Sequence, residues 1–119
     1  MSDFNGKANT DAIINSYTEH GVSMNDIDMC FVLNTFNESD SYKDWYIPAL
    51  GQLALIYLNK TEINAALAKI GGIALTDSYY WASSEIDFYS AWNIFFRSGQ
   101  IGEITKDEGL RVRFVRDLQ

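Results

Sequence analysis

The chain changes its hydrophobic period near Tyr79, and this change limits the folds that it can adopt. Before Tyr79, apolar residues recur three or four positions apart, which is the spacing of one face of an α-helix. After Tyr79, apolar and polar residues alternate, as they do in a β-strand that has one buried face. Helices first and strands afterwards predict an α+β fold with an antiparallel sheet and long loops in the C-terminal third.

Four helices are expected in the first two thirds of the chain, at residues 10–20, 26–37, 49–58 and 61–70. The third has the clearest pattern, because its apolar residues fall at i, i+3, i+4, i+7 and i+8: Leu50, Leu53, Ala54, Tyr57 and Leu58. Asn9 or Thr10 is the expected cap of the first helix, and Thr61 is that of the fourth. Gly71 and Gly72 are expected to end the fourth helix.

Three strands are expected in the C-terminal third, within residues 79–83, 91–97 and 110–116. The second strand alternates between two sets of side chains: Trp92, Ile94 and Phe96 on one face, and Asn93, Phe95 and Arg97 on the other. We interpret the first set as core and the second as outward-facing, because successive strand side chains point to opposite faces. Residues 86–90 and 99–109 lie between the strands and are expected to form loops.

The last expected strand has an alternation of its own. Leu110, Val112 and Phe114 point one way, whereas Arg111 and Arg113 point the other. Glu85 lies near the end of the first strand, and a carboxylate there can bind a guanidinium through two parallel hydrogen bonds. We therefore expect Glu85 to pair with one of three arginines: Arg111, Arg113 and Arg116.

Several motifs spread over the chain occur together in one bacterial family. They are Gly6-Lys7-Ala8-Asn9-Thr10, Asp44-Trp45-Tyr46-Ile47-Pro48, Leu50-Gly51-Gln52-Leu53, Ile63-Asn64-Ala65-Ala66-Leu67, Tyr80-Trp81-Ala82-Ser83-Ser84-Glu85, Ala91-Trp92-Asn93-Ile94-Phe95-Phe96 and Arg111-Val112-Arg113-Phe114-Val115-Arg116. Their combination resembles the C-terminal domain of bacterial collagen-like adhesins, the Lcl C-terminal domain family, which occurs in surface and phage proteins. The resemblance covers nearly the whole chain. It implies a single C-type-lectin-like domain over residues 1–119 that serves binding and not catalysis.

The chain departs from the family pattern in two places. Phe114 stands where the family usually has proline. The family also usually has a strand or hairpin before the Gly6-Lys7-Ala8-Asn9-Thr10 segment, whereas only residues 1–5 precede it here. The domain is therefore expected to lack that first strand. Some related lectin-fold domains are diversified by mutagenic retroelements, and the residue types at 86–90 are compatible with such diversification.

The charge balance and the apolar runs narrow the choice of partner. The 119 residues include 16 acidic and 9 basic ones, a net charge of -7, which argues against binding to nucleic acid or anionic lipid. No apolar run approaches the ~20 residues of a membrane span, and no signal-peptide pattern opens the chain. The family resemblance implies a surface protein or glycan of a target cell as partner, at an extracellular, cell-surface or virion location. Association of copies into a homo-oligomer stays open.

Metals, cofactors and catalytic groups are not expected. His20 and Cys30 are the only histidine and cysteine, too few for a zinc site or an internal disulfide. Calcium-dependent lectins carry a Trp-Asn-Asp triplet, and Trp92-Asn93-Ile94 lacks its closing acid. Their second triplet contains proline, and Pro48 is the only proline of this chain. We therefore expect binding that is independent of calcium.

The candidate binding residues are the positions that the family motifs leave open. Aromatic residues and arginine on an exposed face are typical of interaction sites, although some of these aromatics could belong to the core. The candidates lie on the outward strand face and in the loops of residues 86–110: Asp87, Phe88, Tyr89, Asn93, Phe95, Arg97, Ser98, Gln100, Glu103, Thr105, Asp107, Glu108 and Leu110. Ligand recognition by a phage tail or bacterial surface protein is the expected function. The alternative is a structural domain of a fibre or adhesin that binds only neighbouring chains.

Overall fold

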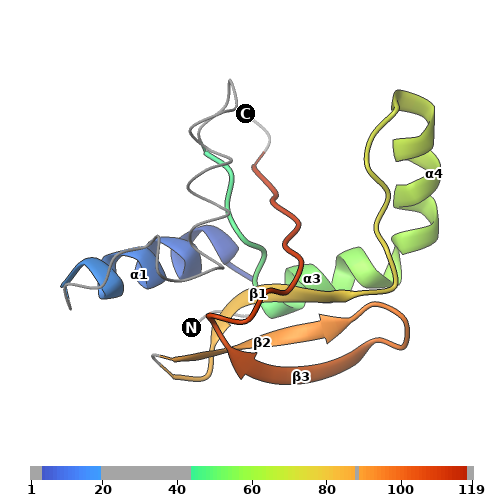
Figure 1. Cartoon of the computed structure of the whole chain (residues 1–119). Helices are drawn as coiled ribbons and strands as arrows, with labels where there is room; N and C mark the ends of the chain where they lie inside the picture. Colours follow the sequence, from blue (N-terminus) through green and yellow to red (C-terminus); the bar gives the residue numbers. More distant parts are fainter. Residues whose placement is uncertain (1–3, 20–43, 88, 118–119) are drawn as a thin grey trace.

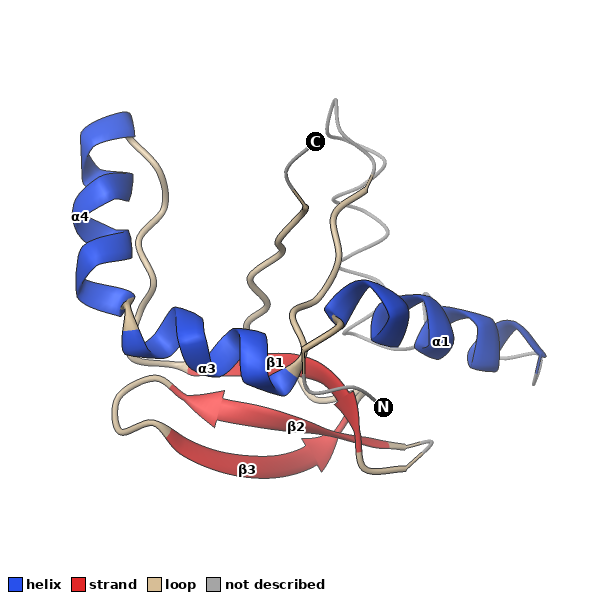
Figure 2. Ribbon diagram, turned by 180° about the vertical axis from the view of Figure 1, so that it is seen from behind, coloured by secondary structure: helices blue, strands red, loops and turns tan. Residues whose placement is uncertain are grey.

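Three helices and three strands make up the computed structural model, which describes residues 4–19, 44–87 and 89–117. In chain order they are α1 (Gly6–Glu19), α3 (Leu50–Leu58), α4 (Lys60–Ile70), β1 (Tyr79–Glu85), β2 (Ser90–Phe95) and β3 (Gln100–Thr105). Figures 1 and 2 show α3 lying along the sheet, α1 beside β1, and α4 standing away from the sheet as an arm. The predicted α+β class is confirmed, whereas the predicted strands agree only in part.

The strands form one antiparallel sheet in the order β1-β2-β3, so β2 is its central strand. Asn93 in the middle of β2 pairs with Trp81 of β1 on one side and with Gly102 of β3 on the other. The pairing register between β1 and β2 shifts between Trp81 and Glu85, as it does at a β-bulge. The hairpin arrangement places the two loops of the sheet, 86–89 and 96–99, at opposite ends of β2.

The third strand differs from the predicted one. Residues 110–116 make isolated bridges, Tyr80↔Arg111 and Tyr46↔Val115, and form no regular strand. β3 instead occupies residues 100–105, which were expected to be loop. Its two isoleucines, Ile101 and Ile104, are three positions apart, so no period of two is visible in the sequence. Pairing with β2 overrides this weak local pattern, because strand formation depends strongly on the neighbouring strand.

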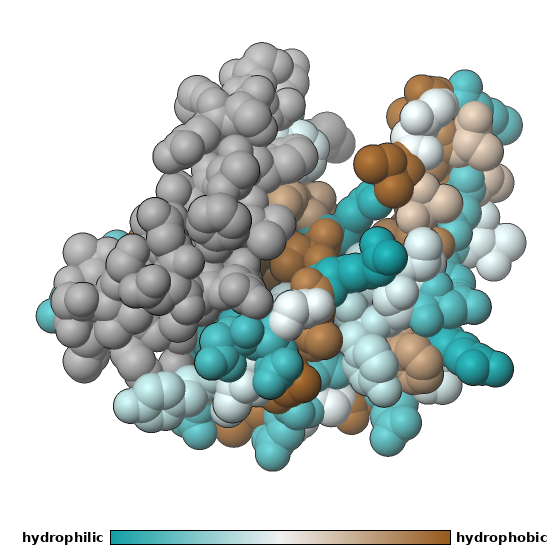
Figure 3. Space-filling model, in the orientation of Figure 1, coloured by the Kyte–Doolittle hydropathy of each residue, from teal (hydrophilic) through white to brown (hydrophobic). Residues whose placement is uncertain are grey.

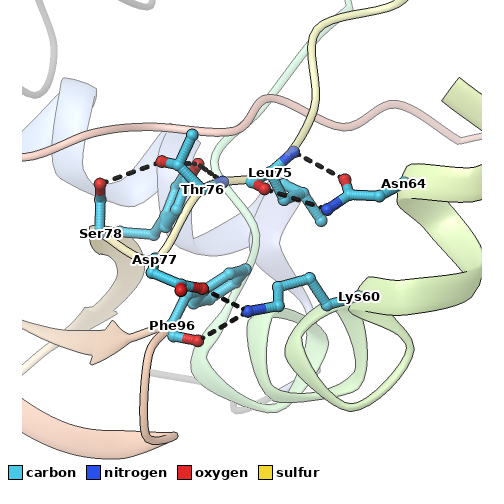
Figure 4. Close-up of polar contacts among 8 residues, drawn as sticks. Lys60, Asn64, Leu75, Thr76, Asp77, Ser78 and Phe96 are labelled. Carbon is cyan, nitrogen blue, oxygen red and sulfur yellow. Dashed lines mark hydrogen bonds and ion pairs between the residues drawn. The ribbon is translucent and has the colours of Figure 1, made fainter. Parts of the chain in front are cut away.

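The turn between β2 and β3 depends on a glycine and on two helices. Gly99 has a φ of 79°, a backbone conformation that favours glycine, and a Cβ there would lie 2.7 Å from Cε2 of Tyr57 in α3. Lys60 at the start of α4 donates hydrogen bonds to the carbonyl oxygen of Phe96 (3.1 Å) and to the carboxylate of Asp77 (2.6 Å) (Figure 4). The turn is thus held against the junction of α3 and α4.

The helix boundaries show where the sequence patterns were right. α3 and α4 begin within one residue of the predicted positions, and Gly71, with a φ of 72°, caps the end of α4 as expected. Asn59 and not Thr61 is the N-terminal cap residue of α4. The predicted helix 26–37 lies outside the described residues, as do His20 and Cys30.

The first helix begins four residues earlier than predicted. The side-chain oxygen of Asn5 accepts the N–H of Ala8 (3.1 Å), so Asn5 satisfies a donor in the first turn and α1 starts at Gly6. Asn9 and Thr10, the predicted caps, lie inside α1 and are buried. Thr10 instead anchors the segment before α3, because its hydroxyl oxygen accepts the N–H of Ile47 (3.1 Å).

Both faces of the sheet are covered by apolar side chains. One cluster contains Ile13, Ile47, Trp81 and Ala91. The other contains Leu53, Leu75, Tyr80, Ala82, Ile94 and Phe96. Trp81 and Tyr80 are consecutive in β1 and point into different clusters, as the alternation of a strand requires. The expectation that one face of the sheet is open to solvent is therefore wrong over most of β2.

Burial along β2 corrects the assignment of its two faces. Ile94 and Phe96 are buried as predicted, but Trp92 is only partly buried. Asn93 was expected to point outward and is 4% exposed, because its face of the strand carries the cluster around Trp81. Phe95 is half-buried, so only Arg97, which lies in the turn beyond β2, is fully exposed among the predicted outward set.

Hydrogen bonds and an ion pair hold the C-terminal segment against the residues before α3. Tyr46 and Val115 exchange two backbone hydrogen bonds of 2.8 and 3.0 Å. The guanidinium of Arg116 donates to both carboxylate oxygens of Asp44, at 2.8 and 3.1 Å. The hydroxyl of Tyr46 donates to Asp117 (2.6 Å), and burial together with this hydrogen bond raises the pKa of Tyr46.

The Asp44–Arg116 pair predicts one pH dependence of stability. The hydrogen bond from Arg116 lowers the pKa of Asp44 below its ordinary value of 3.8. A carboxyl group with a lowered folded-state pKa stabilises the fold above its unfolded pKa, and this contribution is lost as the pH falls through the folded value. Asp44→Asn is therefore expected to melt below the parent at about pH 6, and the difference in melting temperature should disappear as the pH falls through the folded-state pKa of Asp44, which lies below 3.8. Melting curves over a pH series test this, and a difference in melting temperature that does not change with pH would contradict it.

Candidate functional site

The predicted binding residues do not form one surface. Most of those that are exposed or half-buried lie at the two ends of β2, which are on the order of 17 Å apart at the rise of an extended strand. The turn surface comprises Tyr79, Phe95, Arg97, Ser98 and Gln100. The loop surface comprises Ile86, Asp87, Tyr89, Thr105, Asp107 and Glu108. Phe88 lies outside the described residues.

Three predicted residues belong to neither surface. Asn93 is buried in the middle of the sheet between its partners in β1 and β3. Glu103 is exposed but pairs with Trp92, on the sheet face that α3 covers. Leu110 is half-buried and packs against the cluster around Trp81. We therefore assign none of the three to the turn surface or to the loop surface.

The turn surface is built around a pair of stacked rings. Tyr79 of β1 and Phe95 of β2 are register partners, with ring centroids 4.4 Å apart and ring planes 15° from parallel. Tyr79 is 50% exposed, so the pair presents aromatic surface to solvent. Gln100 is the partner of Phe95 on the other side and is also exposed. Tyr79 was not among the predicted binding residues, although its position opposite Phe95 follows from a hairpin register.

Charged groups lie beside the stacked rings. The hydrogen bond from Lys60 lowers the pKa of Asp77, and the positive charge of Arg97 lowers it further. Arg97 follows Phe95 by two residues and is exposed in the turn. The turn surface thus combines aromatic area with an arginine and an amide, the residue types that are enriched where proteins bind partners.

The loop surface is organised by its own hydrogen bonds. The Oδ1 atom of Asp87 accepts the N–H groups of Tyr89 (2.9 Å) and Ser90 (2.8 Å), which is the geometry of an Asx turn. Asp87 was predicted to bind a ligand, and here its carboxylate shapes the loop. Tyr89 is 72% exposed, and Asp107 and Glu108, which are also exposed, directly follow Lys106, whose backbone N–H binds the carbonyl oxygen of Tyr89.

A buried lysine ties the loop surface to the sheet from inside. Lys106 is 1% exposed, and its ammonium forms an ion pair with Glu85 and donates to the carbonyl oxygen of Asp87 (3.4 Å). Its N–H donates to the carbonyl oxygen of Tyr89 (2.8 Å). The predicted pairing of Glu85 with an arginine is therefore wrong. Arg116 binds Asp44 instead, and Arg113 donates to the carbonyl oxygen of Ile73.

Further features of the structure concern metal clusters, membrane-spanning helices and unpaired buried polar atoms. Within the described ranges, no group of three or more His, Cys, Asp or Glu side chains is placed to hold a metal ion. The same ranges contain no helix that is long and apolar enough to cross a membrane. The indole N–H of Trp81 is buried and has no acceptor among the described atoms, but it is enclosed in the core beside Asn93.

No family model matches the chain, and no curated protein matches it.

Proposed function

We propose that this chain is a recognition domain that binds a ligand through the turn surface and has no catalytic activity. The observation that carries the proposal is the exposed stack of Tyr79 and Phe95, flanked by Arg97 and Gln100. Stacked aromatic rings supply apolar contact area without the loss of side-chain freedom that a long aliphatic chain would suffer. A neighbouring guanidinium and amide add directional hydrogen bonds.

The wider setting of the proposal comes from the sequence motifs. Their similarity to the Lcl C-terminal domain family supports a C-type-lectin-like fold, in a phage tail protein or a bacterial surface protein. The ligand would then be a surface protein or a glycan of a target cell. The small α+β architecture, with a rigid antiparallel sheet that carries loops at both ends, is compatible with this role, because binding residues concentrate in loops on rigid scaffolds.

A double variant tests the turn surface. We expect Phe95→Ala/Arg97→Ala to keep its melting temperature within about 5 °C of the parent, since one side chain is half-buried and the other exposed. The fluorescently labelled domain would be titrated onto a panel of intact bacterial cells and measured by flow cytometry. Loss of one aromatic anchor and one arginine should weaken labelling by about tenfold or more.

The matched control is placed on the loop surface. Tyr89→Ala/Glu108→Ala removes one aromatic ring and one charge at the other end of β2, and it should label cells like the parent. Treating the cells with protease or with periodate separates a protein ligand from a glycan. If a folded Phe95→Ala/Arg97→Ala variant labels cells as well as the parent does, the turn surface is not the binding site. If the parent labels none of the cell types, the proposal that the domain recognises cells is contradicted.

A structural role is the second candidate, and one observation favours it. Large apolar side chains are exposed on α3 and around the tip of α4: Leu55, Leu58, Ile70 and Ile73, at 52%, 73%, 80% and 80%. Large apolar side chains that are exposed in one chain are often covered at contacts between subunits. If copies assemble through this region, light scattering on the purified domain would give a mass above that of one chain.

A further inference from the structure

Two adjoining hollows lie between the residues that follow α4 and the C-terminal segment. The larger, of about 400 Å³, is lined mainly by apolar side chains: Trp45, Leu67, Ile73, Val112 and Phe114. The smaller, of about 310 Å³, shares Ile73 and Val112 with it and continues to Tyr80 and Leu110. Figure 3 shows apolar residues gathered in the recess beside the α4 arm. We call the two hollows together the C-terminal trough; each has the size of a ligand pocket.

The trough carries positive charge in an acidic protein. Arg113 lines both hollows, and its guanidinium donates to the carbonyl oxygen of Ile73 (2.6 Å). Arg111 lines the smaller hollow and is exposed. Neither has a carboxylate partner in the part of the chain that the structure describes. With a net charge of -7 over the whole chain, two such guanidiniums beside an apolar recess favour a ligand that brings its own carboxylate.

The walls of the trough also offer main-chain groups. Ala74 on one wall and Val112 on the other make no backbone hydrogen bonds to the described residues. Free N–H and C=O groups along an edge can pair with an added extended segment. Residues 111–115 run from one bridge to the other, a length of roughly 13 Å at the rise of an extended chain. That length suits a peptide of about four or five residues.

We propose that the C-terminal trough binds a short extended peptide of a partner protein in which apolar side chains alternate with a carboxylate. The apolar side chains would fill the larger hollow between Trp45 and Val112. The carboxylate would bind Arg113 or Arg111, and Arg113 would exchange the carbonyl oxygen of Ile73 for it. The trough is separate from the turn surface, so the proposal stands independently of the recognition function proposed above.

The test is a titration of the ¹⁵N-labelled domain with two blocked pentapeptides, followed by NMR amide shifts. One probe is acetyl-Val-Glu-Val-Glu-Val-amide, and the other has lysine in place of both glutamates. We expect the first to shift amides of residues 71–75 and 110–114 with a Kd near or below about 1 mM, and the lysine peptide to bind at least about tenfold more weakly. Arg111→Gln/Arg113→Gln should abolish this preference, and Arg111→Lys/Arg113→Lys should keep much of it.

Each other outcome counts against the proposal. No shifts up to about 5 mM, equal affinity for both peptides, or shifts confined to residues 86–109 would overturn it. If the NMR signals of the same amides change when the domain alone is diluted, the domain associates with itself through the trough. A second copy of this chain, and not a foreign peptide, is then the occupant. The unperturbed spectra of the two arginine variants report whether they are folded, so a loss of binding can be told from a loss of structure.

Discussion

Glu85→Gln is expected to lower the free energy of unfolding by about 3 kcal/mol, because it removes the counter-charge of a buried ammonium. The side chain of Lys106 is 1% exposed and that of Glu85 is 18% exposed, so water cannot replace the lost charge. Glutamine has nearly the same shape and keeps an oxygen that accepts a hydrogen bond. The loss therefore reports the uncompensated charge and not a cavity.

Two further variants show whether the loss of stability comes from the buried charge or would follow the removal of any carboxylate. Asp11→Asn breaks the exposed pair between Lys7 and Asp11 and should cost only a few tenths of a kcal/mol. The double variant Glu85→Met/Lys106→Met removes both charges and should be more stable than Glu85→Gln alone, because a buried ion pair can be replaced by apolar side chains of similar volume. Urea unfolding of the three variants gives the comparison, and a double variant less stable than the single one would contradict the charge explanation.

The same ion pair has a consequence for the loop surface. The ammonium of Lys106 reaches the carbonyl oxygen of Asp87, and its N–H reaches that of Tyr89. Both hydrogen bonds end in the loop between β1 and β2. A loop that is fixed from inside by a buried charge can keep its path while its exposed side chains are substituted.

Local patterns predicted those elements of the fold that depend on local energetics. The apolar stripe of α3 and the glycines after α4 set both helices within one residue of their positions. The start of α1 was missed because Asn5 can cap a helix as well as Asn9, and the choice depends on distant contacts. Thr10 is needed at Ile47, and a Cβ on Gly6 would lie 2.6 Å from the carbonyl oxygen of Ile47. Such contacts over long sequence separations leave no periodicity to read.

The candidate site was predictable at the level of residue types but not of arrangement. Alternation in β2 placed Asn93, Phe95 and Arg97 on one face, but it gave no information on what covers that face. The cluster of Ile13, Ile47 and Trp81 comes from three distant segments and buries Asn93. Tyr79 joined the site only because the β1–β2 register sets it opposite Phe95. The pairing of Lys106 with Glu85 likewise depends on β3, which the sequence pattern did not indicate.

Phe96→Ala is expected to cost about 4 kcal/mol of unfolding free energy, the largest effect of any single truncation considered. Phe96 is 0% exposed, and its ring packs against Tyr80, with centroids 4.4 Å apart, and edge-on against Tyr57 at 5.5 Å. Truncation would leave a cavity between β1 and α3. The surrounding rings are large and rigid, so they can collapse into that cavity only in part.

The neighbouring residue Phe95 supplies the matched control. Phe95→Ala removes the same side chain one position earlier, from a half-buried site where the ring stacks on exposed Tyr79, and it should cost about 1 kcal/mol. Urea unfolding curves of both variants measure the difference in unfolding free energy, provided that the dependence of this free energy on urea concentration is the same in both. A large loss for Phe96→Ala with a small one for Phe95→Ala would confirm that Phe96, directly after β2, points into the core and that Phe95 is left for the turn surface. Equal losses would mean that the ring stack belongs to the core, and the turn surface would then lose its role as a binding site.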